Sequence, residues 1–343
     1  MRNSGFALVE RTLRRYGART RAAMRPYLRA GEPRRFLYDL VSDYPLRLGK
    51  MMRPSLCLAA ARSLGASVEQ ALPTAVAIEL LHNALLIHDD IEDQSEMRRG
   101  KPSLNALHGV PLALNAGDLL LALSMRPLIE NRRRLGGELA ARIFDDALRT
   151  AYESAEGQAL ELGWRDRNSH EPTPADYLTM VLKKTCWLAT IFPLRAGALI
   201  GSGGGFDLEP LIRLGFFLGA AFQIKDDLLN LQPGKHYGKE LNGDLFEGKR
   251  TLIIIHLLEQ AETIERRELI DILTRERAQR TVSDVRRMIR LIDKYGSREY
   301  AYSVAQDLAG AAMHEFQRAY NGLPRSDDLR FIELMASWVI MRD

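Results

Sequence analysis

The sequence predicts an all-α fold, a single helical bundle. Apolar residues recur at i, i+3, i+4 and i+7 in segment after segment, strand-like alternation is nearly absent, and Gly- or Pro-containing breakers separate the segments. A chain of 343 residues exceeds the ~100–200 residues of a usual domain, but large all-helical proteins still form single units. We expect one domain over 1–343, with a helical cap at 1–45, a motif-bearing core at 46–256 and C-terminal helices at 257–343.

The first element is an arginine-rich helix within residues 1–45. Its leucines and alanines recur at helical spacing, and it has no apolar stretch of the kind that a secretory signal requires. A basic amphipathic helix can rest on anionic lipid. We favour the other interpretation, in which the basic face is solvated and the helix caps the bundle.

Ten further segments have helical periodicity. The breakers between them are GKMMRP near residue 50, RRGKP at 98, EPTP at 171, GSGGG at 201 and QPGKHYGKELNGD at 232. The last breaker predicts one long loop, whereas the other connections are short. The predicted helices span 51–64, 69–90, 111–130, 136–166, 173–201, 206–231, 249–261, 283–295, 296–321 and 326–341.

Composition argues against several classes of function. The formal charge of +4 is too small a surplus to indicate a nucleic-acid partner. Asp118 interrupts the apolar stretch at 112–125, and Pro193 with Arg195 interrupts 187–202, so we expect no stable membrane insertion. The two cysteines are far apart and lack metal-binding spacing, which favours a reducing cytoplasm.

Two apolar helices end in similar acidic clusters, IHDDIED and IKDDLLN. In a helix, Asp89 and Asp93 share a face with Asp90 beside them, so two or three carboxylates can point into one space. Oxygen-only clusters suit Mg²⁺, which is usually bound through one or two carboxylates plus substrate phosphates. An isolated cluster is more often a charged helix end that faces water. Here each cluster closes a long apolar helix, and this favours a site for diphosphate. The second cluster contains Asp226, Asp227 and Asn230.

Basic residues near these clusters supply the complementary charge. Lys50 and Arg53 are three residues apart at a predicted helix start, so both can reach one anion there. Arginine forks and lysine ammonium groups commonly hold phosphate oxygens. Each of these cations alone is more often an ordinary surface residue, but jointly they indicate two diphosphate sites. The other candidates are Arg98, Arg99, Lys184, Lys239 and Lys249.

Eight spaced motifs resemble those of the trans-isoprenyl diphosphate synthases, the polyprenyl synthetase family that includes farnesyl and geranylgeranyl diphosphate synthases. The resemblance covers residues 46 to 256, and agreement of eight motifs in order makes it specific. The motifs are GKMMRP, ELLHNALLIHDDIED, MRRGKP, NAGD, GQ, KKTCWL, FQIKDDLLN and GDLFEGKRT.

The resemblance implies an isoprenoid synthase helical bundle with a central active-site cavity. It also implies head-to-tail condensation of isopentenyl diphosphate with an allylic diphosphate. About three Mg²⁺ ions would be held on the allylic diphosphate by the two aspartate motifs, Asp89, Asp90 and Asp93 together with Asp226 and Asp227. Family positions around the allylic group match Arg98, Lys184, Gln223, Lys239, Asp244 and Lys249. The metal-free isopentenyl site matches Lys50, Arg53, His82 and Arg99. Thr185 and Gln223 would line the allylic cation with oxygen dipoles.

One departure concerns Asn230, where many relatives carry aspartate. We expect this change to remove a metal-directed charge while keeping an oxygen ligand. A class I terpene cyclase would need no isopentenyl site, so the GKMMRP motif argues against it. A non-catalytic partner subunit is expected to lose one aspartate cluster, and this chain retains both.

Product length and assembly are the remaining expectations. The residues one and two turns before Asp89 would form the floor of the prenyl pocket; they are Leu81, Ala84 and Leu85. Because bulky aromatic residues are absent there, we favour geranylgeranyl diphosphate as product, with a C25 to C35 product or farnesyl diphosphate as alternatives.

Segment 111–130 is apolar around most of its circumference, and its family counterpart lies at a dimer interface. We therefore expect a homodimer.

Overall fold

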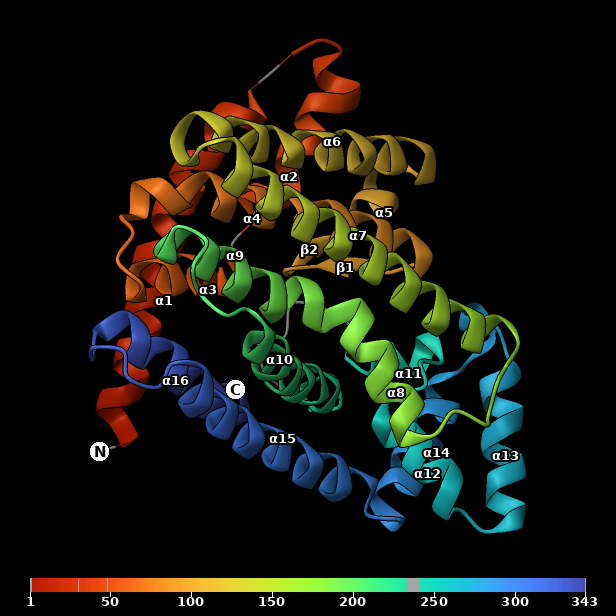
Figure 1. The fold of residues 1–343 in the computed structure, drawn as a ribbon. Coiled ribbons are helices and arrows are strands. Elements are labelled where there is room, and N and C mark those ends of the chain that lie inside the picture. The colour runs from red at the N-terminus through yellow and green to blue at the C-terminus, as the bar shows by residue number, and fades with distance from the viewer. Residues whose placement is uncertain (1, 30, 48, 233–240, 343) are drawn as a thin grey trace.

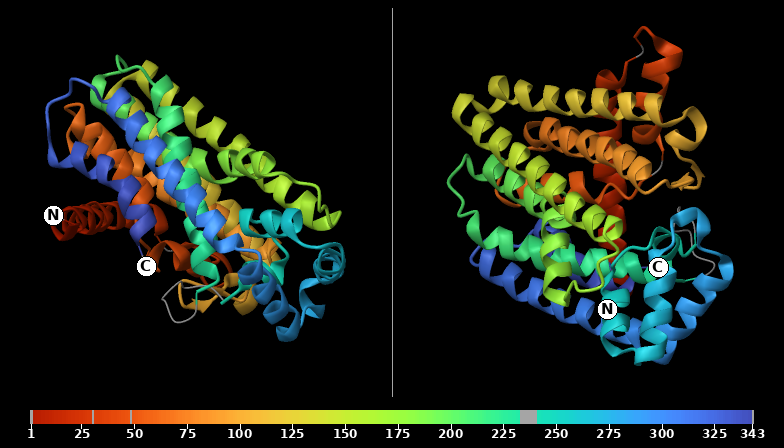
Figure 2. Two further views of the ribbon diagram at one scale, coloured as in Figure 1. Left: turned by 90° about the horizontal axis from the view of Figure 1, so that it is seen from below. Right: turned by 90° about the vertical axis from the view of Figure 1, so that its right-hand side faces the viewer.

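The computed structural model describes residues 2–29, 31–47, 49–232 and 241–342. The all-α prediction is confirmed, because helices make up nearly all of these residues and their strands form a single two-stranded hairpin. The long helices run side by side as a bundle, and a group of shorter helices, α11 to α14, lies together at one end (Figures 1 and 2).

Helix α10 (Glu209–Asn230) lies in the middle of the bundle (Figure 1). It packs along α15 (Ser297–Ala319) on one side and along the π-helical segment η3 (Leu182–Ile191) on the other. A second layer pairs α4 (Val68–Glu92) with α6 (Val110–Leu135), and α3 and α9 pack beside it. The layers therefore bring the C-terminal ends of α4 and α10 together.

The remaining elements complete the bundle and its connections. The N-terminal half contains α1 (Arg2–Met24), η1 (Arg25–Leu28), η2 (Arg34–Tyr38), α2 (Asp39–Leu46), α3 (Met52–Ser63), β1 (Met97–Arg98), β2 (Lys101–Pro102), α5 (Leu104–His108) and α7 (Gly137–Asp166). The C-terminal half contains α8 (Pro174–Val181), α9 (Phe192–Ser202), α11 (Gly243–Glu247), α12 (Leu252–Gln260), α13 (Thr263–Thr274), η4 (Arg277–Gln279), α14 (Val282–Lys294) and α16 (Asp327–Met341).

The ten predicted segments all correspond to helices, with ends that differ by a few residues. Segment 173–201 is one helical run whose middle is π-helical, a distortion that is frequent at functional sites. The short helices α5, α11 and α13 were not predicted. Five residues span little more than one turn, so α5 and α11 are too short to produce a detectable period. Capping residues rather than periodicity mark such helices, as Ser103 does for α5.

The arginine-rich helix α1 packs on the bundle against α3, α4 and α16. Val9, Leu13 and Tyr16 on its apolar side are buried in the main core, and the Tyr16 hydroxyl donates to Asp328 in α16. Arg14 on the opposite side is exposed. This arrangement corresponds to the expected cap with a solvated basic face.

Helices α4 and α6 are both long and apolar enough, by length and composition alone, to cross a membrane. Their burial differs, because 67% of the apolar window of α4 is inside the bundle but only 39% of that of α6. Helix α4 is therefore a core helix. On α6, Leu114 and Ile129 are exposed, and Tyr152 of α7 is 65% exposed.

Candidate active site

A cavity of about 640 Å³ lies among α3, α4, α7, η3 and α10. It contains four carboxylates that come from the two predicted clusters and from α11. We call this group the acidic pole, and it consists of Asp89, Asp226, Asp227 and Asp244. A second group, the cationic pole, lines the same cavity and consists of Lys50, Arg53 and Arg99.

Asp89 faces the cavity from the last turn of α4. Its carboxylate accepts from Arg98 Nη2 at 3.2 Å and from Lys184 Nζ at 3.2 Å. The Lys184 ammonium also pairs with Glu161 of α7. Burial alone would lower the pKa of Lys184, but Glu161 and Asp89 together raise it, so this lysine stays charged. Asp89 therefore lies between two fixed cations.

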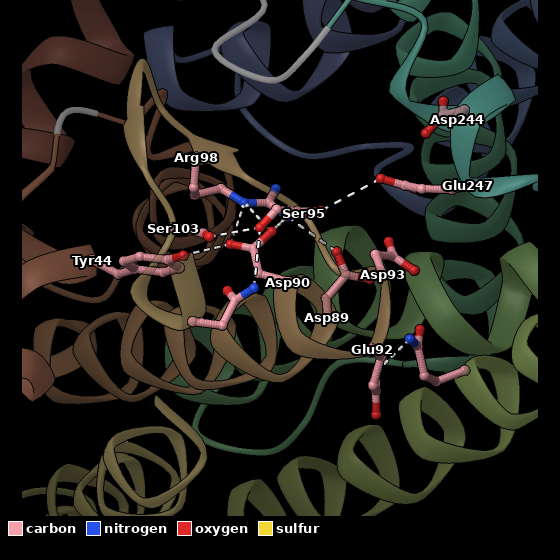
Figure 3. A network of polar contacts seen from close by, with 12 residues as sticks. Tyr44, Asp89, Asp90, Glu92, Asp93, Ser95, Arg98, Ser103, Asp244 and Glu247 are labelled. Carbon is pink, nitrogen blue, oxygen red and sulfur yellow. Dashed lines mark hydrogen bonds and ion pairs between the residues drawn. The ribbon is translucent and has the colours of Figure 1, made fainter. Parts of the chain in front are cut away.

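Asp90 and Asp93 do not line the cavity, and this corrects the expectation that two or three of these carboxylates point into one space. Asp90 is fully buried and accepts from Tyr44 Oη at 2.5 Å and from Arg98 Nε (Figure 3). Asp93 pairs with Lys249 Nζ at 2.6 Å and with Arg165. The reason is helical rotation: Asp90 is turned about 100° from Asp89, and Asp93 caps the helix.

The second cluster places both of its aspartates in the cavity wall. Asp226 Oδ1 accepts from Arg342 Nη2 at 2.5 Å. Asp227 accepts from Tyr177 Oη at 2.7 Å and from Gln223 Nε2 at 2.8 Å. Burial, and next the neighbouring Asp244, raise the pKa of Asp227 to about 8. A proton on Asp227 at neutral pH limits the repulsion within the acidic pole.

Asn230 differs from its expected role as an oxygen ligand. Its Oδ1 accepts from the backbone N–H of Asp244 at 3.1 Å, and its residue is 1% exposed. Asn230 therefore anchors the start of α11 and holds Asp244 at the cavity. Lys239, which we expected near the same diphosphate, lies outside the described residues.

A close helix contact positions Lys184 and Thr185. A Cβ atom added to Gly157 of α7 would lie 2.2 Å from the Lys184 backbone nitrogen, so only glycine permits this approach. Thr185 Oγ1 then donates to Gln223 Oε1 at 2.9 Å. The predicted GQ and KKTCWL motifs thus meet across one helix contact. Both Thr185 and Gln223 line the cavity.

The cationic pole forms where the start of α3 meets α4. Arg99 occupies, with Gly100, the tip of the β1–β2 hairpin, and both residues have positive φ angles. Its guanidinium donates to Asn83 Oδ1 at 3.2 Å and to the Tyr44 carbonyl at 2.9 Å. Burial, followed by Arg53 and Arg99, lowers the pKa of His82 far below its usual value. His82 is therefore neutral at pH 7.

Glu79 and Asn83 support the cationic pole and were missed in the sequence. Glu79 is 2% exposed, lines the cavity, and lies 4.0 Å from Arg99 Nη2. Asn83 Nδ2 donates to Glu79 Oε1 at 3.2 Å. The sequence offered one signal for this pair: an acidic residue within an apolar helix, one turn before an amide on the same face. Tyr177, Arg165 and Arg342 were also missed, and they have no motif of their own.

The apolar part of the cavity contains only one of the three predicted floor residues, Leu85. Ala84 packs instead in the seam between α4 and α6, and Leu81 is buried outside the cavity lining. Ala84 is rotated 100° from Leu85 and is therefore turned away, whereas Leu81 lies on nearly the same face but one turn further from Asp89. The other walls come from α7 and η3, namely Ser154, Ala155, Gln158, Ala159 and Leu188.

The acidic pole suits a hard divalent cation that arrives with a ligand of its own. In the described part of the chain, no three His, Cys, Asp or Glu side chains converge closely enough to hold an ion by themselves. Carboxylate oxygens nevertheless face a shared cavity from α4, α10 and α11. Mg²⁺ usually takes one or two carboxylates and completes its shell with water and phosphate oxygens. The residues present therefore fit Mg²⁺ with a bound diphosphate.

Known proteins resemble this chain over most of its length. A geranylgeranyl diphosphate synthase of Sulfolobus acidocaldarius is 35% identical over 261 residues, 75% of this chain and 77% of the relative. A geranylfarnesyl diphosphate synthase of Aeropyrum pernix is 34% identical over 79% of this chain and 87% of its own. The crystal structure of geranylgeranyl pyrophosphate synthetase from Pyrococcus horikoshii superposes with a TM-score of 0.85, at 32% identity, covering 98% of this chain and 99% of the other.

The sequence profile of the polyprenyl synthetase family matches residues 35–292, which is most of the chain. The match contains both aspartate clusters and the three cations of the cationic pole. The chain therefore belongs to the polyprenyl synthetase family.

Proposed function

We propose that this chain is a Mg²⁺-dependent trans-prenyltransferase that condenses isopentenyl diphosphate with an allylic diphosphate, and that its main product is geranylgeranyl diphosphate. One observation carries the proposal: an acidic pole and a cationic pole both line one cavity. Two diphosphates bound by different means, one through metal and one through direct cations, match this division of charge.

The acidic pole would hold the allylic diphosphate with about three Mg²⁺ ions. When bound, Mg²⁺ supplies positive charge that stabilises the departing diphosphate. Among the chain's own residues, Asp89, Asp226 and Asp244 are the cavity-facing carboxylates for this task, together with Asp227 once it is ionised. Lys184 and Arg98 remain charged beside Asp89 and would donate to the leaving group.

The cationic pole would bind isopentenyl diphosphate without metal. Lys50, Arg53 and Arg99 contribute three positive side chains to the cavity lining. Neutral His82 can donate one hydrogen bond without adding charge. Thr185 and Gln223, joined by a hydrogen bond, line the same cavity and would present oxygen dipoles to the allylic cation. The apolar walls would exclude water that quenches this cation.

The test of this function is radiolabelled isopentenyl diphosphate incubated with farnesyl diphosphate and Mg²⁺. A synthase transfers the label to a longer prenyl diphosphate. A class I terpene cyclase would release a hydrocarbon instead and leave the label in isopentenyl diphosphate. A non-catalytic subunit would do neither, and either outcome would contradict the proposal. The two cysteines lie far apart and lack metal-binding spacing, which favours a reducing compartment, and we propose that the reaction takes place in the cytoplasm.

Product length gives a separate prediction. Leu85 is the α4 residue that lines the apolar part of the cavity one turn before Asp89. Leu85→Phe adds an aromatic ring to this wall, so we expect the main product to become one five-carbon unit shorter. Chromatography of the dephosphorylated products measures the change. Exposed Ile264→Phe is the matched control and should leave the product unchanged. An unaltered product from the Leu85 variant would place the end of the prenyl chain elsewhere.

Assembly gives another prediction. The exposed apolar side chains Leu114, Ile129 and Tyr152 lie on α6 and α7, and covering them by a second copy would remove apolar surface from water. We expect a homodimer at micromolar concentration. Light scattering should give about twice the chain mass of 38.7 kDa. A mass equal to that of one chain would refute the prediction, and Leu114→Glu should weaken the dimer.

A further inference from the structure

Arg342, which follows α16, reaches into the cavity wall although it lies 116 residues from the second acidic cluster. Its side chain is 3% exposed, and its guanidinium stacks on the Phe222 ring at 4.0 Å. Nη2 donates to the Phe222 carbonyl at 3.1 Å and to Asp226 Oδ1 at 2.5 Å, while Nε donates to the Val339 carbonyl at 3.3 Å. The guanidinium is therefore fixed from several sides.

This position puts Arg342 between the two poles of the cavity. Burial, and next the charge of Arg342, lower the pKa of Lys50 in the cationic pole. Trp338 lies beside both groups, 5.7 Å from Lys50 Nζ and 5.9 Å from the Arg342 guanidinium carbon. On the other side, Arg342 forms the ion pair with Asp226, and within the described part of the chain no other cation pairs with that carboxylate. Its charge thus acts on both poles.

We propose that Arg342 is a fixed counterion of Asp226 that makes cation binding at this carboxylate depend on a bound diphosphate. The statement that Asp226 takes a cation rests on the proposed function. A guanidinium beside a carboxylate offsets its charge and repels an approaching divalent ion, so the metal alone binds weakly. A diphosphate brings negative charge that outweighs this repulsion, and Arg342 attracts that charge as well. Metal and diphosphate are thereby taken up together.

Arg342 should weaken the binding of metal alone and strengthen the binding of diphosphate. These opposite effects distinguish the proposal from a purely structural role. Without the guanidinium, the metal alone should bind more tightly, because a positive charge has left the acidic pole. The gain in metal affinity on adding diphosphate should become smaller, because one attraction for the diphosphate has been lost. A merely structural arginine would change neither quantity, although its loss would lower the melting temperature.

The experiment measures Mn²⁺ binding through the resonance signal of free Mn²⁺, in the full chain, with and without inorganic pyrophosphate. In Arg342→Gln we expect the Kd for Mn²⁺ alone to fall roughly three- to thirtyfold. The improvement caused by pyrophosphate should shrink relative to the original chain. Arg342→Lys keeps the charge and should behave like the original. An unchanged or higher Kd for Mn²⁺ alone in the glutamine variant would overturn the proposal.

Controls separate local charge from general damage. Arg213→Gln removes an arginine that pairs with buried Glu315 at 2.9 Å on the same helix as Asp226 and does not line the cavity, so Mn²⁺ affinity should stay constant. Combining Arg342→Gln with Asp226→Asn should abolish the tightening seen in the single variant. If Arg342→Gln is shown by circular dichroism to be unfolded, Arg342→Met retains the apolar stem over Phe222 and carries the same expectation. Turnover is not needed, so a failure of the proposed function would leave these results interpretable.

Discussion

Asp89→Asn and Asp226→Asn should each lower kcat for prenyl transfer on the order of a hundredfold or more while leaving the helical fold intact. The two carboxylates face the cavity from different helices, and each loses the negative charge that would hold Mg²⁺ on the leaving diphosphate. Asparagine keeps the shape, so packing is preserved. In Asp89→Asn, however, Arg98 and Lys184 lose a negative partner, and this should lower the melting temperature by a few degrees.

Steady-state kinetics at saturating substrates and circular dichroism check this expectation together. Asp145→Asn is the matched control, because Asp145 is an exposed acid on α7 outside the cavity lining. Its kcat should be unchanged. Near-normal kcat in both cavity variants would remove these carboxylates from the reaction, whereas loss in only one would assign the leaving group to a single acidic cluster.

The fold could be predicted from the sequence because long amphipathic and apolar helices leave a strong period. The charged ends of α4 and α10 could be predicted to meet because both helices are apolar up to their acidic clusters, and a cavity is the arrangement that accommodates such ends. The direction in which individual side chains point could not be predicted from the sequence. Helix geometry fixes where Asp90 and Asp93 lie relative to Asp89. Whether their carboxylates face the cavity depends on Tyr44, Arg98 and Lys249, which come from three other parts of the chain and bind these carboxylates away from the cavity.

The parts of the site that the sequence did not reveal are those that depend on distant partners. Arg342 has no motif, and its pairing with Asp226 depends on how α16 packs against α10. In the sequence, Glu79 is one polar residue in an apolar helix, and its ion pair depends on the position of Arg99 at the hairpin tip. The prediction of the prenyl-pocket floor was partly wrong for a similar reason, because α6 covers Ala84 while α7 supplies Ser154 and Ala155 to the cavity wall.

The opposite pole should respond differently to mutation. In Lys50→Ala and Arg53→Ala, the KM for isopentenyl diphosphate should rise about ten- to hundredfold, while the KM for the allylic substrate changes much less. Each loss removes a charge-assisted contact worth roughly 1.5–3 kcal/mol. Both cations belong to the cationic pole, which we propose to bind isopentenyl diphosphate directly, so no metal would share the charge of that diphosphate. Burial lowers the pKa of Arg53 to about 10, so it is still charged at pH 7.

Initial rates with one substrate varied at saturating levels of the other give both KM values. Arg62→Ala is the control, since Arg62 lies on the same helix as Arg53 but points to Asp328 at 3.6 Å outside the cavity. Arg53→Ala also removes one of the cations near Glu79, whose pKa is already raised by burial, and leaves Arg99 at 4.0 Å as its ion-pair partner. A double variant, Arg53→Ala with Glu79→Gln, should therefore regain melting temperature but not affinity for isopentenyl diphosphate. An effect confined to the allylic KM would reverse the assignment of the two poles.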